Sequence, residues 1–120
     1  MTGMTEAINE PEARARVEAL RAAAPMESAC VELAQALLTW SYALDRDGRT
    51  ADAADAAEEA VKTLSPYFLA NPAAHADAMN AIVAEYLGTS QRSRRKADMT
   101  LIAPLAAPLG HAEFADEDDD

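Results

Sequence analysis

The chain has 120 residues, half of them apolar and only 5% aromatic, and it carries a formal net charge of −11. Such a surface repels phosphate backbones and anionic lipid headgroups, which disfavours general nucleic-acid binding and adsorption to membranes. No apolar run reaches the roughly 18 residues of a membrane span, no basic-then-apolar leader is present, and the single cysteine has no internal partner. We therefore expect one cytoplasmic domain with no nucleic-acid or membrane partner.

Helical periodicity dominates the sequence. Much of the apolar half is alanine, which has the highest helix propensity, and no alternating run of β-branched residues is long enough to predict a strand. We expect an all-α fold of about five helices in antiparallel hairpins. The expected helices cover residues 11–24, 26–45, 50–69, 73–87 and 93–103. The patternless residues 1–10 are expected to be flexible.

Prolines and glycines mark the predicted helix ends. Gly48 can take the positive φ that a tight reversal needs, and residues 88–90, Gly-Thr-Ser, predict a second turn. Pro104 and Pro108 are expected to stop the fifth helix. The apolar stripe between residues 30 and 44 is too wide for one neighbour to bury, so the second helix should lie in the middle of the bundle.

The end of the sequence is strongly acidic. Glu113, Asp116 and the run 117–120 place six acids in the last eight residues. Such a segment cannot bury enough apolar surface to order itself. We predict a helical domain over residues 11–104, followed by a disordered acidic tail over residues 105–120.

Residues 34–67 resemble a tetratricopeptide repeat (TPR), a helical hairpin of about 34 residues. With Ala34 as the first position, large apolar and small residues stand where that family prefers them, and a glycine stands at the interhelix turn. The matching residues are Leu37, Trp40, Ser41, Leu44, Gly48, Ala53 and Ala60. Two positions depart from the pattern, because Ala57 replaces a usual aromatic residue and Pro66 is displaced by one residue.

The resemblance implies a function as well as a fold. TPR-like modules stack hairpins into a superhelix whose concave groove holds a peptide or a partner helix, and they have no catalytic machinery. A short array leaves apolar edges that need capping helices, a partner or a second copy of the chain. A homodimer through these exposed helical edges is therefore one expected form.

The residues that could carry chemistry form no recognisable site. His75 and His111 lack metal-ligand spacing with their neighbours, and Cys30 lies on the apolar stripe of its helix. With four glycines in total, no phosphate-binding loop is present. The sequence therefore predicts no enzyme, no metal and no cofactor. A small-molecule pocket near Cys30 and Trp40 is the least favoured alternative.

The run 92–96, Arg-Ser-Arg-Arg-Lys, reverses the sign of charge locally. It either binds a phosphate, a nucleic acid or an acidic partner, or it is a solvated helix start that the acidic tail neutralises. Cations are unfavourable at a helix N-terminus, and this conflict keeps the binding interpretation open.

These observations favour a non-catalytic adapter or scaffold that binds a protein, as a peptide or partner helix, in a groove between the second and fourth helices. The net charge favours a cationic ligand. The predicted contact residues are Leu38, Tyr42, Asn80, Arg92, Arg94 and Arg95. The alternative is an acidic regulatory protein whose tail masks a basic or nucleic-acid-binding surface of a partner.

Overall fold

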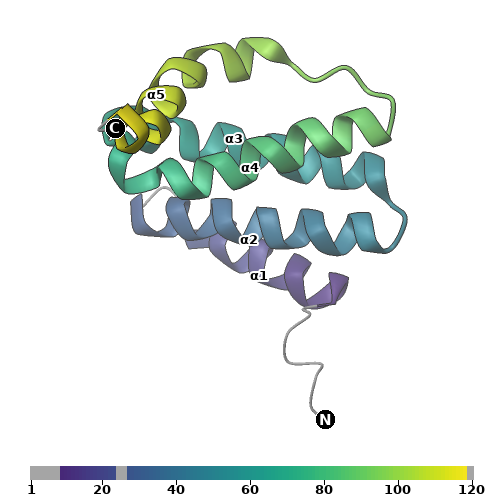
Figure 1. Cartoon of the computed structure of the whole chain (residues 1–120). Helices are drawn as coiled ribbons and strands as arrows, with labels where there is room; N and C mark the ends of the chain where they lie inside the picture. The colour runs from purple at the N-terminus through teal and green to yellow at the C-terminus, as the bar shows by residue number, and fades with distance from the viewer. Residues whose placement is uncertain (1–8, 24–26, 119–120) are drawn as a thin grey trace.

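The computed structural model describes the backbone of residues 9–23 and 27–118, and the side chains of residues 9–23 and 28–109. Within these ranges the chain forms helices and no strand, which confirms the all-α prediction (Figure 1). The helices are α1 (Glu10–Ala23), α2 (Glu27–Arg46), α3 (Thr50–Ala70), α4 (Pro72–Arg92) and α5 (Met99–Asp118). The predicted flexible N-terminus falls mostly on residues outside this description.

Consecutive helices pack on each other, with the chain reversing between them (Figure 1). The α2 helix contacts α1, α3 and α4, so the prediction that it lies inside the bundle is confirmed. The α3 helix is equally central, because it contacts α2, α4 and α5. Next-but-one helices therefore also touch, α2 against α4 and α3 against α5.

Alanines line the inner faces of the central helices. In α3 they include Ala53, Ala57 and Ala60, none of which exposes any surface. Small side chains let helix axes approach closely, and the larger core residues fill the space on either side of this contact. The largest fully buried side chains of the three central helices are Leu37, Leu44, Leu64, Phe68, Met79 and Ile82.

Apolar and polar contacts hold the α1 helix against this core. Ala13 and Val17 are buried. The indole N–H of Trp40 donates to Glu10 Oε2 at 2.8 Å, at the start of α1. Near its other end, the Nε–H of Arg21 donates to Glu59 Oε2 on α3 at 3.0 Å.

Residues 88–90 are helical, so the predicted turn at this place is wrong. The α4 helix continues through Gly88 to Arg92, and Thr89 and Ser90 are buried. A glycine inside a helix costs only about 1 kcal/mol, and the Thr89 hydroxyl is satisfied within the helix by donating to the Glu85 carbonyl at 2.7 Å. The reversal comes later, where Arg94 adopts a φ of 61°.

The α5 helix begins and ends later than predicted. It starts at Met99, after Asp98 accepts a hydrogen bond from the Thr100 N–H at 3.0 Å, and it passes through Pro104 and Pro108. Each interior proline costs about 3 kcal/mol. Buried apolar side chains at helical spacing offset this cost at about 1.5–3 kcal/mol each. These side chains are Ile102, Leu105 and Leu109.

The packed part of the chain thus extends at least to Leu109. Beyond it only the helical backbone as far as Asp118 is described, and Asp119 and Asp120 lie outside the described residues. The predicted boundary of the tail at residue 105 is therefore wrong, because residues 105–109 are helical and Leu105 and Leu109 pack against the core. Disorder of the acidic residues beyond them stays a prediction.

Two glycine substitutions test the turn between α2 and α3. Gly48 has a φ of 84°, and a Cβ there would meet no atom within 4 Å, so only backbone strain opposes a side chain. We expect Gly48→Ala to lower the free energy of unfolding by about 1 kcal/mol. Gly88→Ala, inside α4, should leave it unchanged or raise it, because alanine favours the helix and its Cβ would meet only the end of the Arg92 side chain. Urea unfolding of both variants checks this; equal losses would contradict it.

Candidate partner-binding surface

Two predicted contact residues, Leu38 and Tyr42, share one face of α2. They are four residues apart, so their side chains lie one above the other on the helix. Leu38 is half-buried against the core, whereas Tyr42 exposes 47% of its surface. A large aromatic side chain that is this exposed, above a partly covered leucine, is a typical anchor for a protein partner.

This face of α2 meets α4 at Glu85. The Ser41 hydroxyl, which exposes no surface, lies 2.8 Å from Glu85 Oε2 and 2.9 Å from the Ala53 carbonyl oxygen of α3. Burial raises the pKa of the Tyr42 hydroxyl, and the negative charge of Glu85 raises that pKa further. Tyr42 and Glu85 are therefore electrostatic neighbours.

One turn further along α2, Asp45 joins the two helices a second time. Arg92 Nη2 of α4 donates to Asp45 Oδ2 at 2.7 Å. We call the region formed by Leu38, Tyr42 and Asp45 of α2 with Glu85 and Arg92 of α4 the α2/α4 surface.

Asn80 does not belong to this surface. It is five residues before Glu85, which places it about 140° around α4 at 3.6 residues per turn. Ser41 contacts Glu85, so it is the Glu85 side of α4 that borders α2. The structure therefore separates Asn80 from the predicted contact residues of α2.

Two arginines of the basic run, Arg92 and Arg95, make hydrogen bonds and ion pairs with other parts of the same chain. Arg95 Nη1 donates to Asp55 Oδ1 at 2.7 Å and to the Ala51 carbonyl at 2.9 Å, and the bond to Asp55 raises the pKa of the Arg95 guanidinium. Arg92 is held by Asp45. In the described part of the chain, Arg94 makes no ion pair. Acids of α2 and α3 therefore neutralise Arg92 and Arg95. One of the two interpretations of the sequence gave this role to the acidic tail.

Sequence reasoning overlooked Glu85 and Asp45. Glu85 follows the buried Ile82 by three residues and precedes the buried Tyr86, so it had to lie at the edge of the apolar stripe of α4. That position was a usable signal. Asp45 and Arg92 are 47 residues apart in the chain, and no local sequence pattern predicts that they pair.

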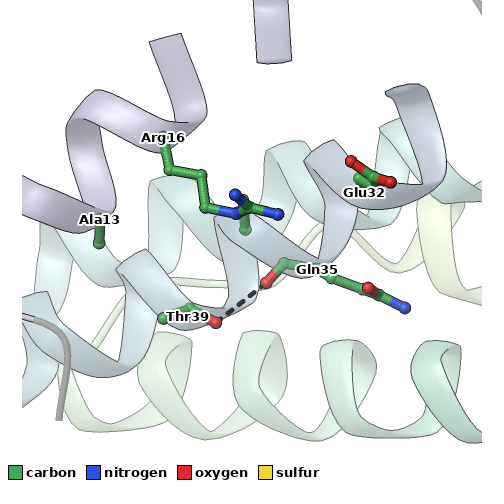
Figure 2. A pocket seen from close by; sticks show the side chains of 6 residues that line it. Ala13, Arg16, Glu32, Gln35 and Thr39 are labelled. Carbon is green, nitrogen blue, oxygen red and sulfur yellow. Dashed lines mark hydrogen bonds between the residues drawn. The ribbon is translucent and has the colours of Figure 1, made fainter. Parts of the chain in front are cut away.

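Among the described residues, two pockets lie elsewhere, each lined in part by residues of α1. The first, of about 190 Å³, lies between α1 and α2 and is lined by Arg16, Glu32 and Gln35 among others (Figure 2). The second, of about 240 Å³, lies over Trp40 and is ringed by charges. Both are smaller than the roughly 300–1,000 Å³ typical of small-molecule sites.

The acidic side chains that line the second pocket already form ion pairs with arginines of the same chain. Glu59 pairs with Arg21, Asp52 with Arg49, and Asp55 with Arg95. Across the described side chains, no group of three or more His, Cys, Asp or Glu residues could hold a metal ion. Neither pocket therefore offers a built site for a ligand.

In the described ranges, no helix combines the length and the apolar content that crossing a bilayer requires. No protein-family model matches the sequence, and no curated protein or solved structure matches it at a significant level.

A matched pair of substitutions tests the structural role of the basic run. Arg95→Gln removes the ion pair with Asp55, so we expect it to lower the free energy of unfolding. The loss should be at most about 1 kcal/mol, because both partners are partly exposed to solvent. Arg94→Gln makes the same chemical change where no ion pair is present and should leave stability unchanged. Thermal unfolding measures both, and a larger loss in Arg94→Gln would contradict the assignment.

The ionisation of Tyr42 tests its closeness to Glu85. Its folded-state pKa is raised above the usual value near 10, so the stability linked to the neutral phenol is present below pH 10 and lost as the pH rises through that raised pKa. In an NMR titration of tyrosine ring carbons, Glu85→Gln should lower this pKa only in part, because burial is the larger cause. An unchanged Tyr42 pKa in the variant would refute the proximity.

Proposed function

We propose that this chain is a non-catalytic protein-interaction module that binds a peptide or partner helix on the α2/α4 surface. The observation that carries the proposal is Tyr42, half exposed above Leu38 and beside a sheltered carboxylate. This arrangement combines an aromatic anchor and apolar area on α2 with a negative charge on the neighbouring α4.

The packing of the helices supports the hypothesis that the module is TPR-like. The TPR-like positions Leu37, Ser41, Leu44, Ala53 and Ala60 are all buried. Ser41 meets the backbone of Ala53 at 2.9 Å, where small residues are expected at the helix crossing. The contacts of α2 with α4 and of α3 with α5 are those that stacked hairpins make. In such an array the α2/α4 surface corresponds to the concave side. A cytoplasmic location is part of this proposal and fits the single cysteine.

Capture from native lysate tests the proposal. The intact chain should recover a specific protein, and Tyr42→Ala should lose it. Leu69→Ala is the matched control, because Leu69 exposes 46% of its surface on α3, outside the α2/α4 surface, and this variant should retain the partner. Recovery that is equal with both variants, or lost with both, would contradict the proposal.

Light scattering of the purified chain separates binding from self-association. Large apolar side chains are also exposed at Leu69, Leu87 and Met99, and these could join two copies. A monomer with a captured partner fits an adapter. A stable dimer that Tyr42→Ala leaves intact, with no partner recovered, would count against the α2/α4 surface as the binding site.

The acidic regulator is the second candidate, and the six acids in the last eight residues favour it. A truncated chain that lacks residues 113–120 distinguishes the two. Partner capture by the truncated chain fits binding on the α2/α4 surface, whereas loss of most of the captured partner fits a tail that masks a basic surface.

A further inference from the structure

Glu85 differs from the other sheltered carboxylates of the molecule. Five described acidic side chains are buried or half-buried, and four of them have a cationic partner. Glu10 pairs with Arg14, Asp45 with Arg92, Glu58 with Lys62, and Glu59 with Arg21. Across the described side chains, no Lys, Arg or His nitrogen lies within 4.0 Å of Glu85.

Among the described residues, the side-chain hydrogen bond that Glu85 accepts comes from Ser41, and Ser41 also has a second acceptor. A serine hydroxyl carries a single proton, so Ser41 can donate fully to only one of its two acceptors, Glu85 Oε2 or the Ala53 carbonyl. A carboxylate has about four acceptor positions, and a sheltered one gains most from charged donors. No other described side chain donates to Glu85, so a donor of a partner could use its remaining acceptor positions.

The surroundings of Glu85 suit a cation. Tyr42 directly follows Ser41, whose hydroxyl lies 2.8 Å from Glu85 Oε2, and its side chain is half exposed. An aromatic face attracts ammonium and guanidinium groups. Arg92, the cation of the α2/α4 surface as defined above, is held at 2.7 Å by Asp45. Leu38 offers apolar area one turn away along α2.

We propose that Glu85 and Tyr42 form the binding site for a Lys or Arg side chain of a partner helix. An apolar residue of that helix, next to the Lys or Arg, packs on Leu38. This inference rests on the proposed function and specifies the chemistry of the partner, a basic amphipathic helix. The two partners would match in charge, because the chain carries a net charge of −11 and Glu85 is the sheltered carboxylate that has no cationic partner among the described side chains.

The test uses a synthetic amphipathic helical peptide with leucines along one face and lysines beside them. A second peptide with glutamines in place of the lysines is the matched ligand. Isothermal titration calorimetry with the full chain should show binding of the lysine peptide, and an affinity at least about tenfold lower for the glutamine peptide. NMR of the lysine complex should show the largest shifts at Tyr42 and Glu85.

Two variants of the chain test whether the lysine peptide binds at Glu85. Glu85→Gln keeps the contact with Ser41 and removes the charge, so binding of the lysine peptide should fall at least about tenfold. Glu12→Gln makes the same change at an exposed position on α1 and should have no effect. Circular dichroism establishes that both variants fold. Undiminished binding by Glu85→Gln, no binding by the unmodified chain, or equal affinity for the two peptides would overturn the inference.

The outcome also separates this inference from the proposal on which it rests. A lysate partner that is lost with Tyr42→Ala but kept with Glu85→Gln would support the interaction module and reject Glu85 as the binding site for a cation. Loss of that partner with both variants, together with the peptide result, would support both.

Discussion

The close contact of α3 with α2 and α4 is the constraint on which the rest of this structure depends. Because alanines line the inner face of α3, both neighbours can lie close enough for their own side chains to meet. Ser41 is the point where this happens, since its hydroxyl is near the α3 backbone and the Glu85 carboxylate of α4 at once. A bulky residue in place of Ala53 or Ala57 would separate α2 from α4 and dismantle the surface that carries Tyr42.

Charge is distributed so that a strongly acidic chain can still pack. Arginines reach across elements to acids on the central helices, from α1 to Glu59, from α4 to Asp45, and from the loop after α4 to Asp55. Each such pair contributes little on its own because it is partly exposed. Together they reduce the self-repulsion of a chain with a net charge of −11 and fix the ends of α1 and α4. Glu85, sheltered at the centre of the α2/α4 surface, lies outside this network.

The sequence predicted the helices well wherever apolar periodicity and a strong boundary residue agreed. Gly48 lies in the turn before α3 as expected, and α3 begins at the predicted residue 50. Prediction failed at residues 88–90 and at Pro104, where the tertiary burial of Thr89, Ser90 and Leu105 outweighs the tendency of Gly88 and Pro104 to end a helix. Local pattern alone cannot anticipate such burial.

The surface was only partly predictable for a related reason. Leu38 and Tyr42 could be found from their place beside the apolar stripe of α2. The internal use of Arg92 and Arg95, and the contact between Ser41 and Glu85, join residues at least 40 positions apart in the chain. Such pairings follow from the packing of the helices and leave no signature in a short stretch of sequence. The misplacement of Asn80 has the same origin, because which side of α4 faces α2 is decided by packing.

The proposed interaction places one specific cation of the partner on Glu85. A double-mutant cycle measures this pairing, combining Glu85→Gln in the chain with replacement of single lysines by glutamine in the bound peptide. We expect one lysine position to couple to Glu85 by at least about 1 kcal/mol, while the other positions do not. Coupling of about zero at every lysine would contradict the claim and reduce the role of Glu85 to general electrostatic attraction.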